Sequence, residues 1–155
     1  MKKEHSDYLT QQYPKIYRKS NHSFGVYSFE CGDGWFNLLK GLSMCIQNYI
    51  DNTTRERWRI RKDKRRFAEL PPDEQKVSHL NRDMPERVRQ VVALQVKEKF
   101  GTLRYYYSGG DEVINNYVSY ADVMSSLTCE ECGVPSETDY NQSWVTTKCA
   151  TCKGK

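Results

Sequence analysis

Two Cys-x2-Cys pairs constrain the fold of this chain more than any other feature of its sequence. They are Cys129–Cys132 and Cys149–Cys152, and sixteen residues separate the two pairs. Each pair holds two thiolates on one tight turn. Two such turns placed face to face give four sulfurs in a tetrahedron, the geometry that suits Zn²⁺. The spacing therefore predicts one zinc site with the ligands Cys129, Cys132, Cys149 and Cys152, and Gly133 allows the left-handed backbone that such a turn often needs.

Disulfides and redox chemistry explain the four cysteines less well. The chain opens with Met1-Lys2-Lys3-Glu4 and shows no apolar signal stretch, and six cysteines in 155 residues is far below the density of disulfide-rich proteins. A redox Cys-x2-Cys normally occurs singly, near a βαβ pattern. Because four cysteine ligands leave no open coordination position, we expect the zinc to be structural and not catalytic.

Periodicity in the rest of the chain predicts an α+β fold. Residues 24–29 alternate as in a strand, and residues 35–50 carry apolar side chains three and four apart, as in an amphipathic helix with Asp33 as its N-cap. Residues 91–107 predict a β-hairpin, and a second amphipathic helix begins at Asp111. These elements form a small domain with amphipathic helices and a hairpin.

The expected organisation is an α+β domain over residues 1–127 and a four-cysteine zinc ribbon over residues 128–155. Within the ribbon, residues 144–147 are a strand candidate that leads into the second cysteine turn. The second helix runs almost directly into Cys129, so we expect the ribbon to be held against the domain rather than to swing on a tether.

Positive charge is concentrated in one segment. Residues 55–66 contain eight basic residues against two acidic ones, a net +6, so the rest of the chain sums to −2 although the total is +4. The basic residues are Arg55, Arg57, Arg59, Arg61, Lys62, Lys64, Arg65 and Arg66, with Trp58 among them. Arginines that flank an aromatic ring can grip phosphates and stack on a base. We therefore predict that this segment, part of an insertion of about residues 52–87, contacts DNA or RNA. The alternative is a charged helix or insertion that faces solvent and binds nothing.

No established catalytic motif occurs in the sequence. It lacks a His-x-x-x-His pair, a Walker-type phosphate loop and a Gly-x-Ser-x-Gly elbow. One enzyme hypothesis remains, a metal-dependent nuclease in which carboxylates bind Mg²⁺ and a Gln-x-Lys strand positions the attacking water. Its candidate residues are Asp33, Gln95, Lys97 and Glu98, with Glu30 as a further partner. Because side chains alternate along a strand, Gln95 and Lys97 share a face that Glu98 does not, and a solvent-facing strand explains them better.

Three segments carry a resemblance to a known group of proteins. They are ECGDGWF at residues 30–36, QVKEKFGTLRYY at residues 95–106, and the paired cysteines. Together they resemble a group of small uncharacterised proteins encoded by tailed bacteriophages, and the likeness covers about residues 24–152 except the segment 52–87, which has no counterpart. The resemblance implies a virus-encoded accessory protein that acts in a bacterial cytoplasm, and it implies no catalytic residue.

These features together favour a soluble, non-enzymatic binding module. Its partner is a nucleic acid, contacted through the basic segment, or a host protein, contacted through the rim of the ribbon. The rim consists of Glu130, Glu131, Pro135 and Trp144. No apolar run approaches the ~18–20 residues that a membrane span requires, so we expect no membrane partner and a cytoplasmic location.

Overall fold

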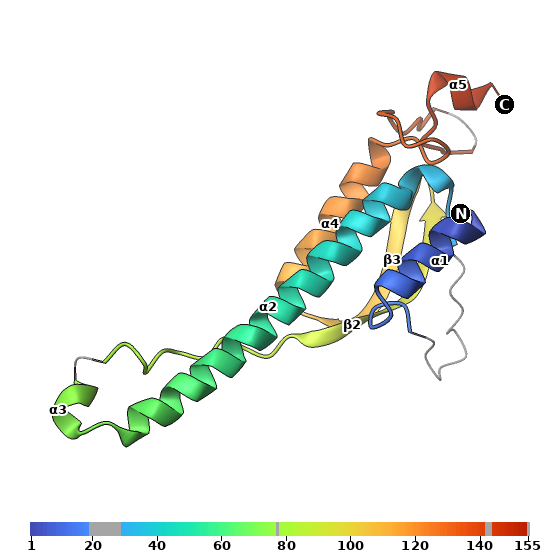
Figure 1. Ribbon diagram of the computed structural model, residues 1–155. Helices are drawn as coiled ribbons and strands as arrows, with labels where there is room; N and C mark the ends of the chain where they lie inside the picture. Colours follow the sequence, from blue (N-terminus) through green and yellow to red (C-terminus); the bar gives the residue numbers. More distant parts are fainter. Residues whose placement is uncertain (19–28, 77, 142–143, 155) are drawn as a thin grey trace.

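The computed structural model describes residues 1–18, 29–76, 78–141 and 144–154. Its elements are α1 (Lys3–Gln12), β1 (Phe29–Glu30), the 3₁₀ helix η1 (Asp33–Trp35), α2 (Phe36–Glu69), α3 (Pro72–Gln75), β2 (Arg89–Lys99), β3 (Thr102–Gly110), α4 (Glu112–Ser126) and α5 (Ala150–Lys153). Helices α1, α2 and α4 cover one face of a three-stranded sheet (Figure 1). The expected α+β fold class is confirmed.

The sheet has the strand order β1-β2-β3, with β1 parallel to β2 and β2 antiparallel to β3. The predicted hairpin is therefore confirmed. Of the strand expected over residues 24–29, only Phe29 belongs to β1, and residues 24–28 lie outside the described part of the chain.

A register shift between Ala93 and Gln95 changes which side chains of β2 face the helices. Strict alternation along β2 would put Leu94 and Val96 on one inner face, but Val91, Ala93 and Val96 belong to the core and Leu94 is only half-buried. A β-bulge adds one residue to one strand and so reverses the alternation beyond it. Gln95 and Lys97 still share one face, as predicted.

The core lies between the sheet and the helices that cover it. Its buried apolar side chains include Leu9 from α1, Trp35 from η1, Leu39 and Ile46 from α2, Val91 and Val96 from β2, Leu103 and Tyr105 from β3, and Ile114 from α4. Because every one of these elements contributes, none can move far without exposing apolar surface to water.

Two helix starts were predicted from the sequence, and one is confirmed. The carboxylate of Asp111 accepts a hydrogen bond from the backbone N–H of Ile114 and caps α4. Asp33 does not cap α2. It lies in η1, and its carboxylate instead accepts from the backbone N–H of Lys2 and contacts His5 Nδ1.

Helix α2 is longer than the sequence pattern indicated, because it continues past residue 50 to Glu69. Residues 52–69 are therefore the second half of this helix and not an irregular insertion. Arginine, lysine, glutamate and alanine all favour helices, and Ile60 (2% exposed) gives this half a buried apolar side chain. The helix ends just before Pro71, since a proline disfavours helical backbone in the preceding residue.

The second half of α2 extends beyond the sheet, with α3 at its far end and residues 78–88 returning along it to β2 (Figure 1). Arg82 holds the two segments together, with ion pairs of 2.8 Å to Glu56 and to Asp63. Arg57 donates a further hydrogen bond to the carbonyl oxygen of Pro85. We call residues 53–88 the basic arm.

Candidate metal centre and basic arm

The four predicted cysteine ligands lie together at the end of the molecule opposite the basic arm (Figure 1). Their sulfur atoms are all within 4.8 Å of one another, and Cys132 Sγ lies 3.7 Å from Cys149 Sγ. With Zn–S bonds of about 2.3 Å, a tetrahedral site places its sulfurs roughly 3.8 Å apart. The cluster therefore has the size of a tetrahedral metal site.

Each cysteine pair sits on a short turn that backbone hydrogen bonds close. In the first turn, Gly133 N donates to Cys129 O (2.8 Å), and Gly133 has the predicted left-handed backbone with φ of +77°. In the second turn, Cys152 N and Lys153 N donate to Cys149 O, at 3.0 and 2.9 Å. These turns bring the two sulfurs of each pair to the same side of the chain.

The environment of the sulfurs favours the thiolate of Cys129 and opposes those of Cys132 and Cys152. Burial disfavours ionisation of Cys129, but backbone N–H groups of Cys149, Cys132 and Glu131 outweigh it and lower the pKa of the Cys129 thiol to about 6. The neighbouring sulfurs of Cys149 and Cys132 raise the pKa of Cys152 to about 12. Several thiolates this close together repel one another, and a bound cation offsets that repulsion. The arrangement is therefore typical of a metal site.

The cysteine segment is docked on the loop that precedes α2. Gly34 N donates to Glu130 O (2.7 Å), and Trp35 Nε1 donates to Thr128 O (2.9 Å). A Cβ added to Gly34 would clash with Cys129 O, because the two atoms would be much closer than 3.0 Å, the shortest distance at which Cβ atoms are normally found. Gly34 therefore permits close contact between this loop and the cysteine segment.

Glu130 belongs to the same docking contact. Its carboxylate accepts a hydrogen bond from Gly32 N (2.7 Å), and a Cβ on Gly32 would clash with Glu130 O. Burial, opposed by that hydrogen bond, raises the pKa of the Glu130 carboxyl. Glu130 was expected on an exposed rim, but it is half-buried and bonded to the body of the protein. Spacing alone gave no sign of this partner, because ninety-eight residues separate the two.

The hairpin turn makes the second docking contact. Thr147 Oγ1, fully buried, donates to Gly101 O (2.5 Å) and lies 2.6 Å from Thr138 Oγ1. The strand expected over residues 144–147 is reduced to one isolated bridge between Thr146 and Asp139. The cysteine segment is thus a compact knot held by side-chain and backbone contacts to the body.

The basic run lies on the arm, and its charges are unevenly distributed around α2. Its two carboxylates, Glu56 and Asp63, are paired with Arg82 of the returning segment. The side chains of Arg55, Arg59, Arg61, Lys62, Arg65 and Arg66 are exposed. Arg57 and Lys64 are half-buried, and Arg57 bonds to Pro85. One face of the arm is therefore strongly cationic.

Trp58 lies on this cationic face and is 64% exposed. Together with Arg61, Lys62 and Arg65 it lines a hollow of about 370 Å³. Lys62 Nζ lies 5.8 Å from the centre of the indole ring, which is within the range of a cation–π contact.

The candidate nuclease residues are divided between different environments. Gln95 Nε2 lies 3.5 Å from Glu30 Oε2, and the register places Lys97 beside Glu30. Glu98 instead accepts from Gly101 N (2.6 Å), and Asp33 bonds to the N-terminal segment. Among the described residues, the four cysteines form the one group of His, Cys, Asp or Glu side chains gathered closely enough to hold a metal ion.

The fold and the cysteine cluster define an α+β protein with a four-cysteine metal-binding knot docked on its sheet and helices. No family model matches the chain, and neither the curated proteins nor the solved structures give a match. In the described part of the chain, no helix combines the length and the apolar character that crossing a membrane requires.

Proposed function

We propose that this protein is a non-enzymatic nucleic-acid-binding module. In this proposal the cysteine knot holds one structural Zn²⁺, and the cationic face of the basic arm binds a single-stranded nucleic acid. The observation that carries the proposal is the exposure of Trp58 among outward-facing cations, in a run whose two carboxylates, Glu56 and Asp63, both pair with Arg82.

Zinc is the metal that four cysteines favour. Thiolate ligands select soft or borderline metals, and a four-sulfur tetrahedron is typical of structural zinc. The sulfur spacing supports this identity, and no open position remains for a substrate. The role of the ion is therefore to stabilise the knot, and through it the loop before α2 and the hairpin turn.

The charge distribution on the arm supports contact with phosphates. Arg82 pairs with both Glu56 and Asp63, and Glu56 also lies 4.0 Å from Arg59, so the two carboxylates offset only part of the charge of the eight basic residues in this run. Residues 55–66 of a helix span roughly 17 Å, enough to follow several phosphates of a strand. Binding of this kind releases counterions and weakens steeply with salt.

The exposed indole favours single strands over duplexes. Unpaired bases can stack on an aromatic ring, whereas bases inside a duplex are already stacked. Trp58 provides such a ring, and Arg61 and Arg65 lie beside it to contact the flanking phosphates.

The first test is the salt dependence of binding to labelled single-stranded oligonucleotides. Neutralising Arg59, Arg61, Lys62 and Arg65 to glutamine should reduce the slope of log K against log salt by about 3, at about 0.7 per phosphate contact. A control that removes four exposed or half-exposed lysines elsewhere keeps the same net charge; it changes Lys3, Lys15, Lys40 and Lys99 to glutamine. An equal change of slope in both variants would remove the arm from the interface.

The second test separates base stacking from charge. Trp58→Ala should weaken binding to single strands by roughly 5- to 150-fold, which corresponds to about 1–3 kcal/mol of stacking. Trp144→Ala is the matched control, because Trp144 is also exposed (75%) but lies on the cysteine knot. Trp58→Phe should retain most of the affinity. Equal losses for Trp58→Ala and Trp144→Ala would contradict the proposal.

Two other functions remain as outcomes of these tests. Zinc-loaded protein that binds no nucleic acid would direct attention to a host protein, in keeping with the resemblance to bacteriophage-encoded proteins. Metal-dependent cleavage of the oligonucleotide that Lys97→Ala abolishes would favour the nuclease hypothesis instead. The resemblance also favours action in a bacterial cytoplasm, which stays a prediction.

A further inference from the structure

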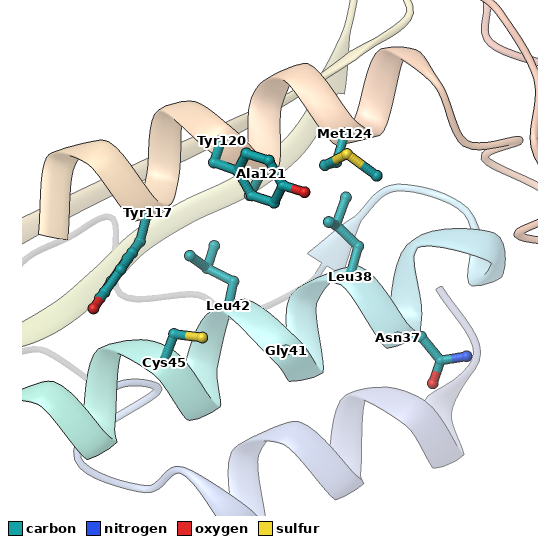
Figure 2. Close-up of a pocket in the computed structure, with 9 residues that line it drawn as sticks. All are labelled: Asn37, Leu38, Gly41, Leu42, Cys45, Tyr117, Tyr120, Ala121 and Met124. Atoms are coloured by element: carbon teal, nitrogen blue, oxygen red, sulfur yellow. The ribbon is translucent and has the colours of Figure 1, made fainter.

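A groove lies between α2 and α4, on the side of these helices that faces away from the sheet (Figure 2). Its volume is about 280 Å³, and none of the residues that line it is charged. Leu38 and Leu42 of α2 form one wall, and Tyr120, Ala121 and Met124 of α4 form the other. The groove is thus an apolar hollow on a surface that the described residues leave open.

Gly41 lies in this groove, and no neighbour in the described chain requires a glycine there. It sits in the first half of α2, where glycine weakens a helix relative to alanine. An added Cβ would meet no atom within 4 Å, in contrast to Gly34, where the same Cβ would clash with the cysteine segment. A bare backbone at the floor of a groove lets another molecule approach closely.

The surface around the groove is uncharged over a wide area. The exposed side chains of this half of α2 include Asn37, Met44, Cys45 and Asn48. On α4, all of whose residues the structure describes, the charged residues are Glu112 at its first position and Asp122, which pairs with Arg104 of β3 at 3.0 Å. Charged residues make up 28% of the chain, so this α2/α4 face stands apart from the rest of the surface. Depletion of charge around exposed apolar and aromatic side chains is typical of the centre of a protein interface.

We propose that the α2/α4 face binds the same face of a second copy of this chain, in a two-fold symmetric dimer. A two-fold contact brings each side chain near its own copy, so a charged face repels itself and an uncharged face does not. Tyr120 is 66% exposed at the edge of the hollow, so the face carries both a projecting ring and a groove that can receive one. This self-complementarity favours a second copy over an unrelated partner.

The area of the α2/α4 face indicates what kind of dimer it can form. Two helices side by side cover roughly 20 Å, and the first half of α2 is roughly 25 Å long, so each copy offers on the order of 500 Å² of projected surface. This is at the lower end of specific interfaces, so we expect a weak dimer with a dissociation constant on the order of micromolar. The dimer is independent of the proposed nucleic-acid contact, because the groove lies on the half of α2 away from the arm.

Sedimentation velocity of the zinc-loaded protein, from about 1 to about 100 µM, tests the dimer across this range. The wild-type protein should shift from monomer to dimer as its concentration rises. Tyr120→Arg and Gly41→Arg should both stay monomeric, because both side chains project into open space. At low concentration Tyr120→Arg should melt at the wild-type temperature and Gly41→Arg slightly above it, since arginine favours a helix more than glycine does. Tyr140→Arg is the matched control, since Tyr140 is equally exposed (69%) but lies in the cysteine knot; it should still dimerise.

Three results would overturn the proposal. The first is a wild-type protein that stays monomeric at every concentration. The second is a dimer that survives both Tyr120→Arg and Gly41→Arg. The third is a monomer that carries a small apolar molecule which Gly41→Arg excludes, because the groove would then be a ligand site and not a contact between copies.

Discussion

The indole Nε1 of Trp35 donates a hydrogen bond of 2.9 Å to the carbonyl oxygen of Thr128. Trp35 is fully buried at the start of α2, and Thr128 immediately precedes the first cysteine ligand. This hydrogen bond links a fully buried core side chain directly to the start of the cysteine knot. A change in the knot should therefore be detectable at Trp35.

Removal of the metal should change the fluorescence of Trp35. Metal binding by small zinc sites contributes about 10–16 kcal/mol, as much as the whole stability of many domains, so chelation should unfold at least the knot. In a Trp58→Phe/Trp144→Phe background, which leaves Trp35 as the single tryptophan, emission should shift to the red and the melting temperature should fall. Cys132→Ser should give the same spectrum without chelator. Unchanged emission and melting after complete metal removal would contradict the structural role of the ion.

Two glycines of the same region should respond in opposite directions to alanine. Gly34→Ala should lower the free energy of unfolding by at least about 1–3 kcal/mol, because its Cβ would overlap the backbone of the cysteine segment. Gly41→Ala should raise it by about 0.5–1 kcal/mol, because alanine favours the helix and nothing lies within 4 Å. Denaturant unfolding at low protein concentration measures both. A tolerated Gly34→Ala would show that the docking contact is looser than described.

Acid should remove the contribution of Asp33. Desolvation raises its pKa, but hydrogen bonds from Lys2 N and His5 and the charge of Lys2 outweigh it, so the pKa of the folded protein lies below the ordinary value of 3.8. A carboxyl with a depressed pKa stabilises the fold above its unfolded pKa and loses that effect as pH falls through the folded one. Asp33→Asn should therefore cost at most about 1 kcal/mol at pH 7 and nothing near pH 2. A constant difference from pH 7 to pH 2 would show that charge is not the cause.

Two buried tyrosines should differ when each loses its hydroxyl. Tyr17 OH lies 2.7 Å from Ser43 Oγ, so Tyr17→Phe should cost about 1 kcal/mol. Tyr105 OH is buried beside it without a well-formed hydrogen bond to any described residue, so Tyr105→Phe should be neutral or stabilising. Thermal unfolding of the two variants under one set of conditions makes the comparison. Equal losses would indicate that the two hydroxyls share a bond.

Several features could be predicted from the sequence because they depend on local spacing. The cysteine pairs, the cap at Asp111 and the hairpin each rest on residues a few positions apart, and the structure has all three. The length of α2 could not be predicted in this way. Its second half lacks a continuous apolar stripe, and it is held by Arg82, which is nineteen and twenty-six residues away from its two partners.

The sequence by itself determined the cluster of four cysteines that could hold a metal ion, because thiolate chemistry and the two-residue spacing leave little choice of geometry. It also determined the α+β class, because the spacing of apolar residues along the chain distinguishes amphipathic helices from strands. Only the tertiary structure decided that Gly32 and Gly34 make room for the knot, that a bulge at Leu94 reverses the faces of β2, and that the carboxylates of the basic run are paired with Arg82. Each of these depends on contacts between distant segments, which local spacing does not encode.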